Sequence, residues 1–166
     1  MGNHGRVGQL SIIDWEAMNT ITLKGIVVQG HQVASKPSDV YPYGTIEKQK
    51  PYFKELGLNL DDFYSGTLNI SISPNTFELT NPEITFKGLE WTDLNPPETF
   101  SFSRCTLIHK DVRYTGWIYY PHSETKVRHF NNPAVIEVLA QHIPDIYYGD
   151  EVELELDNDE ISILDK

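Results

Sequence analysis

The most regular pattern in the chain runs Ser65-Gly66-Thr67-Leu68-Asn69-Ile70-Ser71-Ile72-Ser73. From Thr67 onward, side chains that carry oxygen alternate with aliphatic side chains. Because successive side chains of a β-strand point to opposite faces, this alternation predicts a strand with one aliphatic face and one polar face. The aliphatic face comprises Leu68, Ile70 and Ile72, and the polar face comprises Thr67, Asn69, Ser71 and Ser73. We expect the aliphatic face to pack in a core and the polar face to present small oxygen-bearing groups.

The polar face has a functional and a structural interpretation. Thr67 and Asn69 could both offer oxygen ligands to a hard cation such as Mg²⁺, which takes few protein ligands and leaves the remaining positions to water and phosphate oxygens. Gly66 precedes them, and its missing Cβ would let a phosphate or another backbone segment approach closely. The alternative is a half-buried strand whose polar face is simply solvated, which is common for strands of this pattern.

Length and composition indicate one mainly β domain. The chain has 166 residues, of which 39% are hydrophobic and 11% aromatic, and this is ample for a single buried core. Aromatic and β-branched residues recur in short runs separated by ten Pro and eleven Gly, which favours strands and turns over helices. We expect an N-terminal arm over residues 1–19 and one domain over residues 20–166.

The charge balance restricts the class of partner. The formal net charge is −11, with a pI near 4.8. A surface this acidic repels the phosphate backbone of nucleic acids, and no patch rich in Lys and Arg is interleaved with aromatic residues, so no nucleic-acid partner is expected. The same acidity opposes a phosphorylated ligand unless a divalent cation or a local group of Lys and Arg offsets it. A small-molecule ligand of that kind therefore implies a bound cation or a local group of Lys and Arg.

The N-terminus and the absence of a long apolar run favour a cytoplasmic location. Residues 1–8 contain no apolar signal-peptide core, and the chain has no run of 18 apolar residues, so no membrane partner is expected. Cys105 is the sole cysteine and cannot form an internal disulfide, which favours a role in the core.

Four further segments bear on the fold. Residues 20–30 predict a first strand that ends at Gly30. Residues 31–50 have no sustained period and suit either a lid over a ligand or a variable surface loop. Pro51 can open a helix of at most two turns that stops at Gly57. Residues 135–139 carry opposite signals, because the capping residues before them favour a helix and their β-branched content favours a strand.

Taken in order, these segments are similar to those of the CTP-dependent riboflavin kinases of archaea, over about residues 22–157. The block most typical of that family is Gly66-Thr67-Leu68-Asn69-Ile70. The other matching blocks are Leu23–Gly30, Leu56-Gly57, Gly116–Pro121, Val135–Ala140 and Gly149–Val152. The resemblance implies a single small closed β-barrel of the cradle-loop type, with about six strands and one or two short helices. It also implies that residues 135–139 form a strand.

The resemblance further implies a phosphotransferase that moves a phosphoryl group from a nucleoside triphosphate to the hydroxyl of a small molecule such as riboflavin. In that case Thr67 and Asn69 hold Mg²⁺ between the nucleotide phosphates. Gly25 and Gly30 belong to the phosphate-binding entry, and Glu137 lies near the acceptor hydroxyl, where it orients that group or takes its proton. The other interpretation of Glu137 is a strand residue that faces solvent.

Two departures from the family pattern leave an alternative function open. The family has a further glycine in a tight loop after the position of Gly30, whereas this chain continues with His31-Gln32-Val33-Ala34-Ser35. Gln141-His142-Ile143-Pro144 replaces the family's Leu-Arg, so an expected positive charge is missing. The alternative is a barrel that keeps the scaffold without the chemistry and binds a small ligand or a protein. The oligomeric state is not indicated by the sequence.

Overall fold

The computed structural model describes residues 19–29, 45–122 and 132–165. In this part of the chain there is one helix, α2 (Thr45–Glu55). The strands are β1 (Thr20–Val28), β2 (Leu68–Ser71), β3 (Thr76–Leu79), β4 (Ile84–Leu89), β5 (Glu98–His109), β6 (Val112–Pro121), β7 (Val135–Ala140), β8 (Glu151–Asp157) and β9 (Ile161–Leu164). The prediction of a mainly β chain is confirmed.

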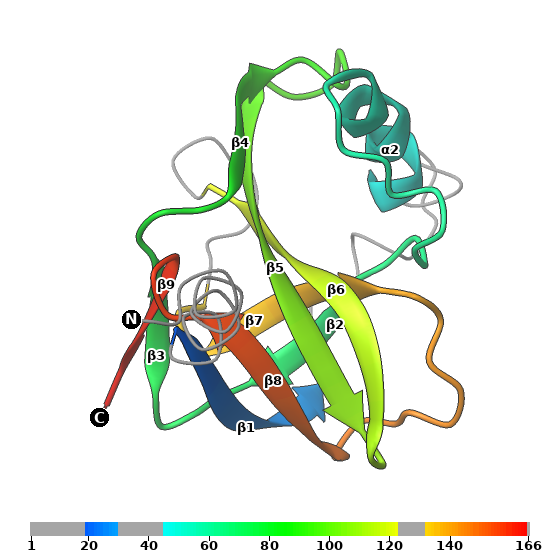
Figure 1. Cartoon of the computed structure of the whole chain (residues 1–166). Coiled ribbons are helices and arrows are strands. Elements are labelled where there is room, and N and C mark those ends of the chain that lie inside the picture. Colours follow the sequence, from blue (N-terminus) through cyan, green and yellow to red (C-terminus); the bar gives the residue numbers. More distant parts are fainter. Residues whose placement is uncertain (1–18, 30–44, 123–131, 166) are drawn as a thin grey trace, which may run out of the picture.

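Six of the strands close into an antiparallel barrel. Seven strands form one sheet in the order β4-β5-β6-β7-β2-β1-β8, and β8 pairs back with β5. The closed circuit is therefore β5-β6-β7-β2-β1-β8, with β4 added along the first half of β5 (Figure 1). A separate two-stranded sheet joins β3 to β9. The predicted closed barrel of about six strands with a short helix is confirmed.

The core has two parts, on opposite faces of the barrel wall. One cluster contains the residues of alternate strand positions that face the barrel interior; its fully buried members include Ile70, Ile118, Ile136, Val138 and Leu154. The second cluster uses the intervening positions and packs against α2; its members include Ile46, Phe53, Phe100, Phe102, Trp117, Tyr119 and Leu139. Figure 1 shows α2 to one side of the barrel, which is the side that this second cluster covers.

The prediction for the helix was wrong in its starting point. The helix begins at Thr45 rather than at Pro51, and Pro51 lies inside it. Its buried residues are Ile46, Gln49, Lys50 and Phe53. This spacing forms one continuous face, so packing on the barrel extends the helix toward the N-terminus although two residues of that face are polar. The predicted end is confirmed, since Gly57 has φ of 108° and the amides of Gly57 and Leu58 bond back to the last turn.

The strand predictions hold, although some bounds differ. Residues 135–139 lie in β7, so the strand interpretation of that segment is confirmed. The alternating segment that ends at Ser73 is regular only over Leu68–Ser71, because its chain leaves the sheet before Pro74. Gly30 and residues 31–44 of the predicted lid lie outside the described residues, and residues 45–50 are helical rather than loop.

Candidate functional site

Thr67, Asn69 and Glu137 meet on the outer face of the barrel wall. Strands β2 and β7 are antiparallel neighbours, and their register places Asn69 opposite Glu137. The Thr67 hydroxyl donates a hydrogen bond to Glu137 Oε1 at 3.1 Å. All three residues are half-buried, while Leu68 and Ile70 point to the other side of the wall. The fold therefore brings together three of the residues that the sequence nominated, although 70 positions separate Thr67 from Glu137.

A buried tyrosine lies next to this group. The Tyr119 hydroxyl donates to Gln49 Oε1 at 2.8 Å and so joins β6 to α2. Burial, with the nearby charges of Glu137 and Glu98, raises the pKa of Tyr119 well above its usual value. Trp91 Nε1 in turn donates to Glu98 Oε1 at 3.0 Å. Polar groups are thus embedded in the second core cluster, and Glu137 lies at the edge of that network.

The helix is anchored to the segment that leads into β2. Lys50 Nζ, on a residue that is 8% exposed, donates to the carbonyl of Phe63 at 2.5 Å. Ser65 Oγ donates to Glu47 Oε1. Polar residues on α2 therefore fix the chain just before Gly66 and Thr67, and this fixes the starting position of the candidate site.

The glycines that the resemblance nominated are not gathered at this site. Gly25 lies inside β1 and faces the barrel interior, where a Cβ would come within 2.4 Å of Ile70 Cγ2. This contact supplies a packing reason for the glycine. Gly66 lies in the wall of a separate hollow, and Gly30 is outside the described residues.

That hollow has a volume of about 270 Å³ and lies between the segment before β2 and the segment after β7. Its lining consists of Tyr64, Gly66, Leu68, Ala140, Gln141, His142, Ile143, Asp145 and Ile146. The rings of Tyr64 and His142 are 5.8 Å apart between centroids. Sequence reasoning noted residues 141–144 only as a missing positive charge. No local pattern indicated that they form a wall with Tyr64, because the two segments are brought together by the pairing of β2 with β7 and by the bond from the Tyr64 amide to the Ala140 carbonyl.

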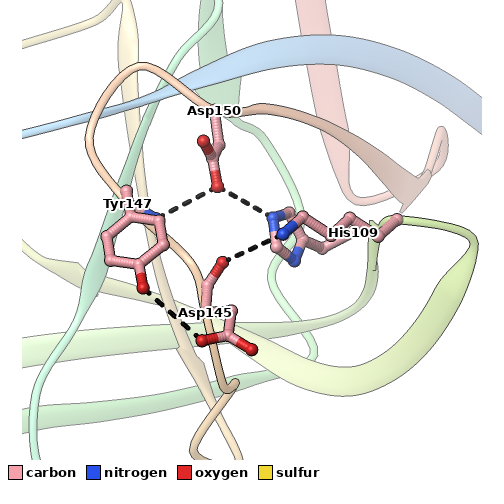
Figure 2. Close-up of polar contacts among 5 residues, drawn as sticks. His109, Asp145, Tyr147 and Asp150 are labelled. Carbon is pink, nitrogen blue, oxygen red and sulfur yellow. Dashed lines mark hydrogen bonds and ion pairs between the residues drawn. The ribbon is translucent and has the colours of Figure 1, made fainter.

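A second polar group that sequence reasoning missed lies where the hairpin of β5 and β6 meets the segment before β8. The buried His109 shares a hydrogen bond of 2.9 Å between its Nε2 and Asp150 Oδ2, which also accepts the Tyr147 amide at 3.0 Å (Figure 2). The Tyr147 hydroxyl donates to Asp145 Oδ1 at 3.4 Å. The Tyr147 amide and His109 together lower the pKa of Asp150. These contacts fasten two connections of the barrel and involve no residue of the Thr67 group.

The donor set decides which metal chemistry is feasible. Within residues 19–29, 45–122 and 132–165, no three His, Cys, Asp or Glu side chains gather to hold a metal ion. A hydroxyl, an amide and one carboxylate are hard oxygen donors, and such a small set suits Mg²⁺, which keeps several waters and phosphate ligands. The residues Thr67, Asn69 and Glu137 therefore fit Mg²⁺ with phosphate better than a transition metal.

Comparisons with known proteins add no family. No protein-family model matches the chain, and no curated protein matches it in sequence. In the described residues, no helix combines the length and the apolar character needed to cross a bilayer.

Proposed function

We propose that this protein is a Mg²⁺-dependent phosphotransferase similar to the CTP-dependent riboflavin kinases, acting on the hydroxyl of a small molecule in the cytoplasm. The observation that carries the proposal is the convergence of Thr67, Asn69 and Glu137 on β2 and β7, with Glu137 directly opposite Asn69. A carboxylate next to two neutral oxygen donors is the arrangement that phosphoryl transfer needs for positioning and charge neutralisation.

In this proposal each residue has one task. The hydroxyl of Thr67 and the amide oxygen of Asn69 would hold the metal ion, which would supply positive charge against the nucleotide phosphates. Glu137 accepts a hydrogen bond from the acceptor hydroxyl and takes its proton as the phosphoryl group arrives. The Thr67–Glu137 bond keeps that carboxylate over the metal ligands until the acceptor replaces it. With a net charge of −11, the protein repels a nucleotide, and a bound cation would offset that repulsion.

Calorimetric titration tests the proposal on the full chain. We expect CTP or ATP to bind with Mg²⁺ and not without it, and riboflavin to be phosphorylated when both are present. Asn69→Leu should abolish the Mg²⁺-dependent heat, and Glu137→Gln should retain nucleotide binding while the transfer rate falls by about 10²–10⁴. Ser71→Ala is the matched control, because Ser71 is the next residue after Asn69 on the same polar face of β2.

The outcomes separate catalysis from a structural role. If wild type gives no heat with either nucleotide, and Asn69→Leu only lowers the melting temperature, the phosphotransferase proposal is wrong. Equal nucleotide affinity in wild type and Asn69→Leu would remove Asn69 from the metal site.

A barrel that binds a small ligand without catalysis is the second candidate. This candidate is favoured by polar side chains near the site that already bond within the protein. The Thr67 hydroxyl is hydrogen-bonded to Glu137, and the Lys50 ammonium is hydrogen-bonded to the Phe63 carbonyl. The hollow of about 270 Å³ beside Tyr64 and His142 would then be the binding site. Binding of riboflavin in the absence of nucleotide and Mg²⁺, lost in His142→Ala, would favour this candidate.

A further inference from the structure

Residues 144–148, which we call the strap, lie in the connection from β7 to β8 and form part of the wall of the hollow. Asp145 and Ile146 line the hollow. The side chains of Tyr147 and Tyr148 are 63% and 62% exposed, whereas Ile146 is half-buried against the barrel core. A segment that buries so little apolar surface opens at a small cost in free energy compared with a core strand.

Both ends of the strap are fixed to the barrel. On one side Ile143 is buried in the barrel core. On the other side the Gly149 amide donates to the Val27 carbonyl at 2.7 Å, and the Val27 amide donates to the Asp150 carbonyl at 2.9 Å. The strap can therefore move away from the hollow while the chain on either side of it stays in place.

One carboxylate oxygen links the strap to the end of β5. Asp150 Oδ2 accepts the Tyr147 amide of the strap at 3.0 Å and lies 2.9 Å from His109 Nε2 (Figure 2). The His109 side chain is 4% exposed and that of Asp150 is 28% exposed, so this bond is shielded from water on the histidine side. Hydrogen bonds to a charged group are stronger than those between neutral groups.

The other polar contacts of the strap are weaker. Lys110 Nζ donates to the Asp145 carbonyl and the Tyr147 hydroxyl donates to Asp145 Oδ1, each at 3.4 Å, which is longer than usual for a hydrogen bond. Asp145 also has φ of 59°, and this left-handed conformation costs energy in a residue other than glycine. That cost is relieved when the strap opens. The closed strap therefore depends mainly on Asp150 and its partner His109.

We propose that the strap is a gate to the hollow and that the His109–Asp150 pair is the latch that keeps it closed. Opening the strap removes Asp145 and Ile146 from the wall and gives a ligand access to the rings of Tyr64 and His142 on the other side. This inference does not rest on the proposed function, because it is tested without a nucleotide or a metal ion.

The first test is amide hydrogen exchange of the full chain, measured residue by residue by NMR. His109→Leu removes the ring nitrogen and keeps a buried side chain of similar size. We expect the Tyr147 amide to exchange about 10- to 100-fold faster in this variant, because a hydrogen bond to a charged group is lost. The Tyr64 amide, which bonds to the Ala140 carbonyl across the hollow, should exchange as in wild type. Tyr147→Phe is the matched control, since it removes only the weak contact to Asp145.

The second test measures access to the hollow. Ala140 lines the hollow and is 3% exposed, so Ala140→Cys places a thiol there, while the native Cys105 in the barrel core reports unfolding of the whole domain. With iodoacetamide and peptide mass spectrometry, adding His109→Leu should speed labelling at position 140 by about tenfold or more and leave Cys105 labelling unchanged. Adding Tyr147→Phe should change neither rate.

The outcomes separate a latch from general destabilisation. The proposal is overturned if His109→Leu leaves Tyr147 exchange and labelling at position 140 as in wild type. It is also overturned if Tyr64 exchange and Cys105 labelling rise by the same factor as the other two rates, because the whole barrel then opens. Circular dichroism checks that each variant is folded, and Asp150→Ala, read by labelling, takes the place of His109→Leu if that variant does not fold.

Discussion

Gly25 is the residue at which the packing argument can be tested most directly. It lies in β1 with its α-carbon facing the barrel interior, and the ideal Cβ of an alanine would be 2.4 Å from Ile70 Cγ2 and 3.0 Å from the Ser71 carbonyl oxygen. Ile70 is fully buried, and its Cγ2 is held next to its own backbone on β2. Neither atom is the free end of a flexible side chain, so the two strands must move apart to admit the methyl group.

The magnitude follows from two opposed effects. Without a clash, Gly→Ala in a strand stabilises a protein by about 0.4–1 kcal/mol, because it reduces the conformational freedom of the unfolded chain. Forcing a methyl group into a filled core costs about 1–3 kcal/mol. We therefore expect Gly25→Ala to lower the free energy of unfolding by about 1–2 kcal/mol. For a domain of this size that corresponds to a melting temperature lower by about 2–8 °C.

The assay is thermal and urea unfolding of wild type, Gly25→Ala and Lys24→Ala. Lys24 is the exposed neighbour on β1, and its substitution should change stability by no more than about 0.5 kcal/mol. Ile70→Leu moves the branch of the side chain away from the backbone. The double variant Gly25→Ala with Ile70→Leu should therefore lose less free energy of unfolding than the two single variants lose in total. A Gly25→Ala protein that melts at or above the wild-type temperature would refute the packing argument. If such a protein also lost nucleotide binding, Gly25 would belong to a phosphate site.

Three other predictions follow from individual side chains. Asp150 has a lowered pKa, so its contribution to stability is complete above its unfolded value of about 4 and is lost as pH falls through the folded value; acid unfolding of Asp150→Asn should therefore depend less steeply on pH below about 4. Cys105 is buried with a pKa raised to about 12, so it should react with a thiol reagent only at the rate of unfolding, which a mass-spectrometric time course measures. Tyr119→Phe leaves the buried Gln49 Oε1 without its donor and should lower the free energy of unfolding by about 1–3 kcal/mol in urea, whereas Tyr147→Phe, at an exposed residue, should change it little.

Local patterns in the sequence were sufficient for much of the strand content. The alternation of residues 67–72 placed Ile70 and Ile72 in the core and Thr67 and Asn69 on the opposite face, because side-chain direction in a strand depends only on position parity. Gly57 ended the helix as expected, since only a residue that tolerates positive φ can close the last turn in this way. These features depend on a few consecutive residues, and therefore the sequence alone could predict them.

Other features depend on contacts between distant segments. The true start of α2 was missed because Gln49 and Lys50 look solvent-exposed by composition. Their partners come from distant parts of the chain: Gln49 bonds to Tyr119 of β6, and Lys50 bonds to the Phe63 carbonyl in the segment before β2. The strand at residues 135–139 could not be chosen from its own signals; its pairing with β2 and β6 decides it.

The candidate site likewise combines features that the local sequence predicts with features that depend on distant segments. Residue types along β2 nominated Thr67 and Asn69, but the sheet register alone sets Glu137 opposite Asn69. The pairing of β2 with β7 brings these groups together, and this pairing is a property of the whole strand order rather than of any single strand.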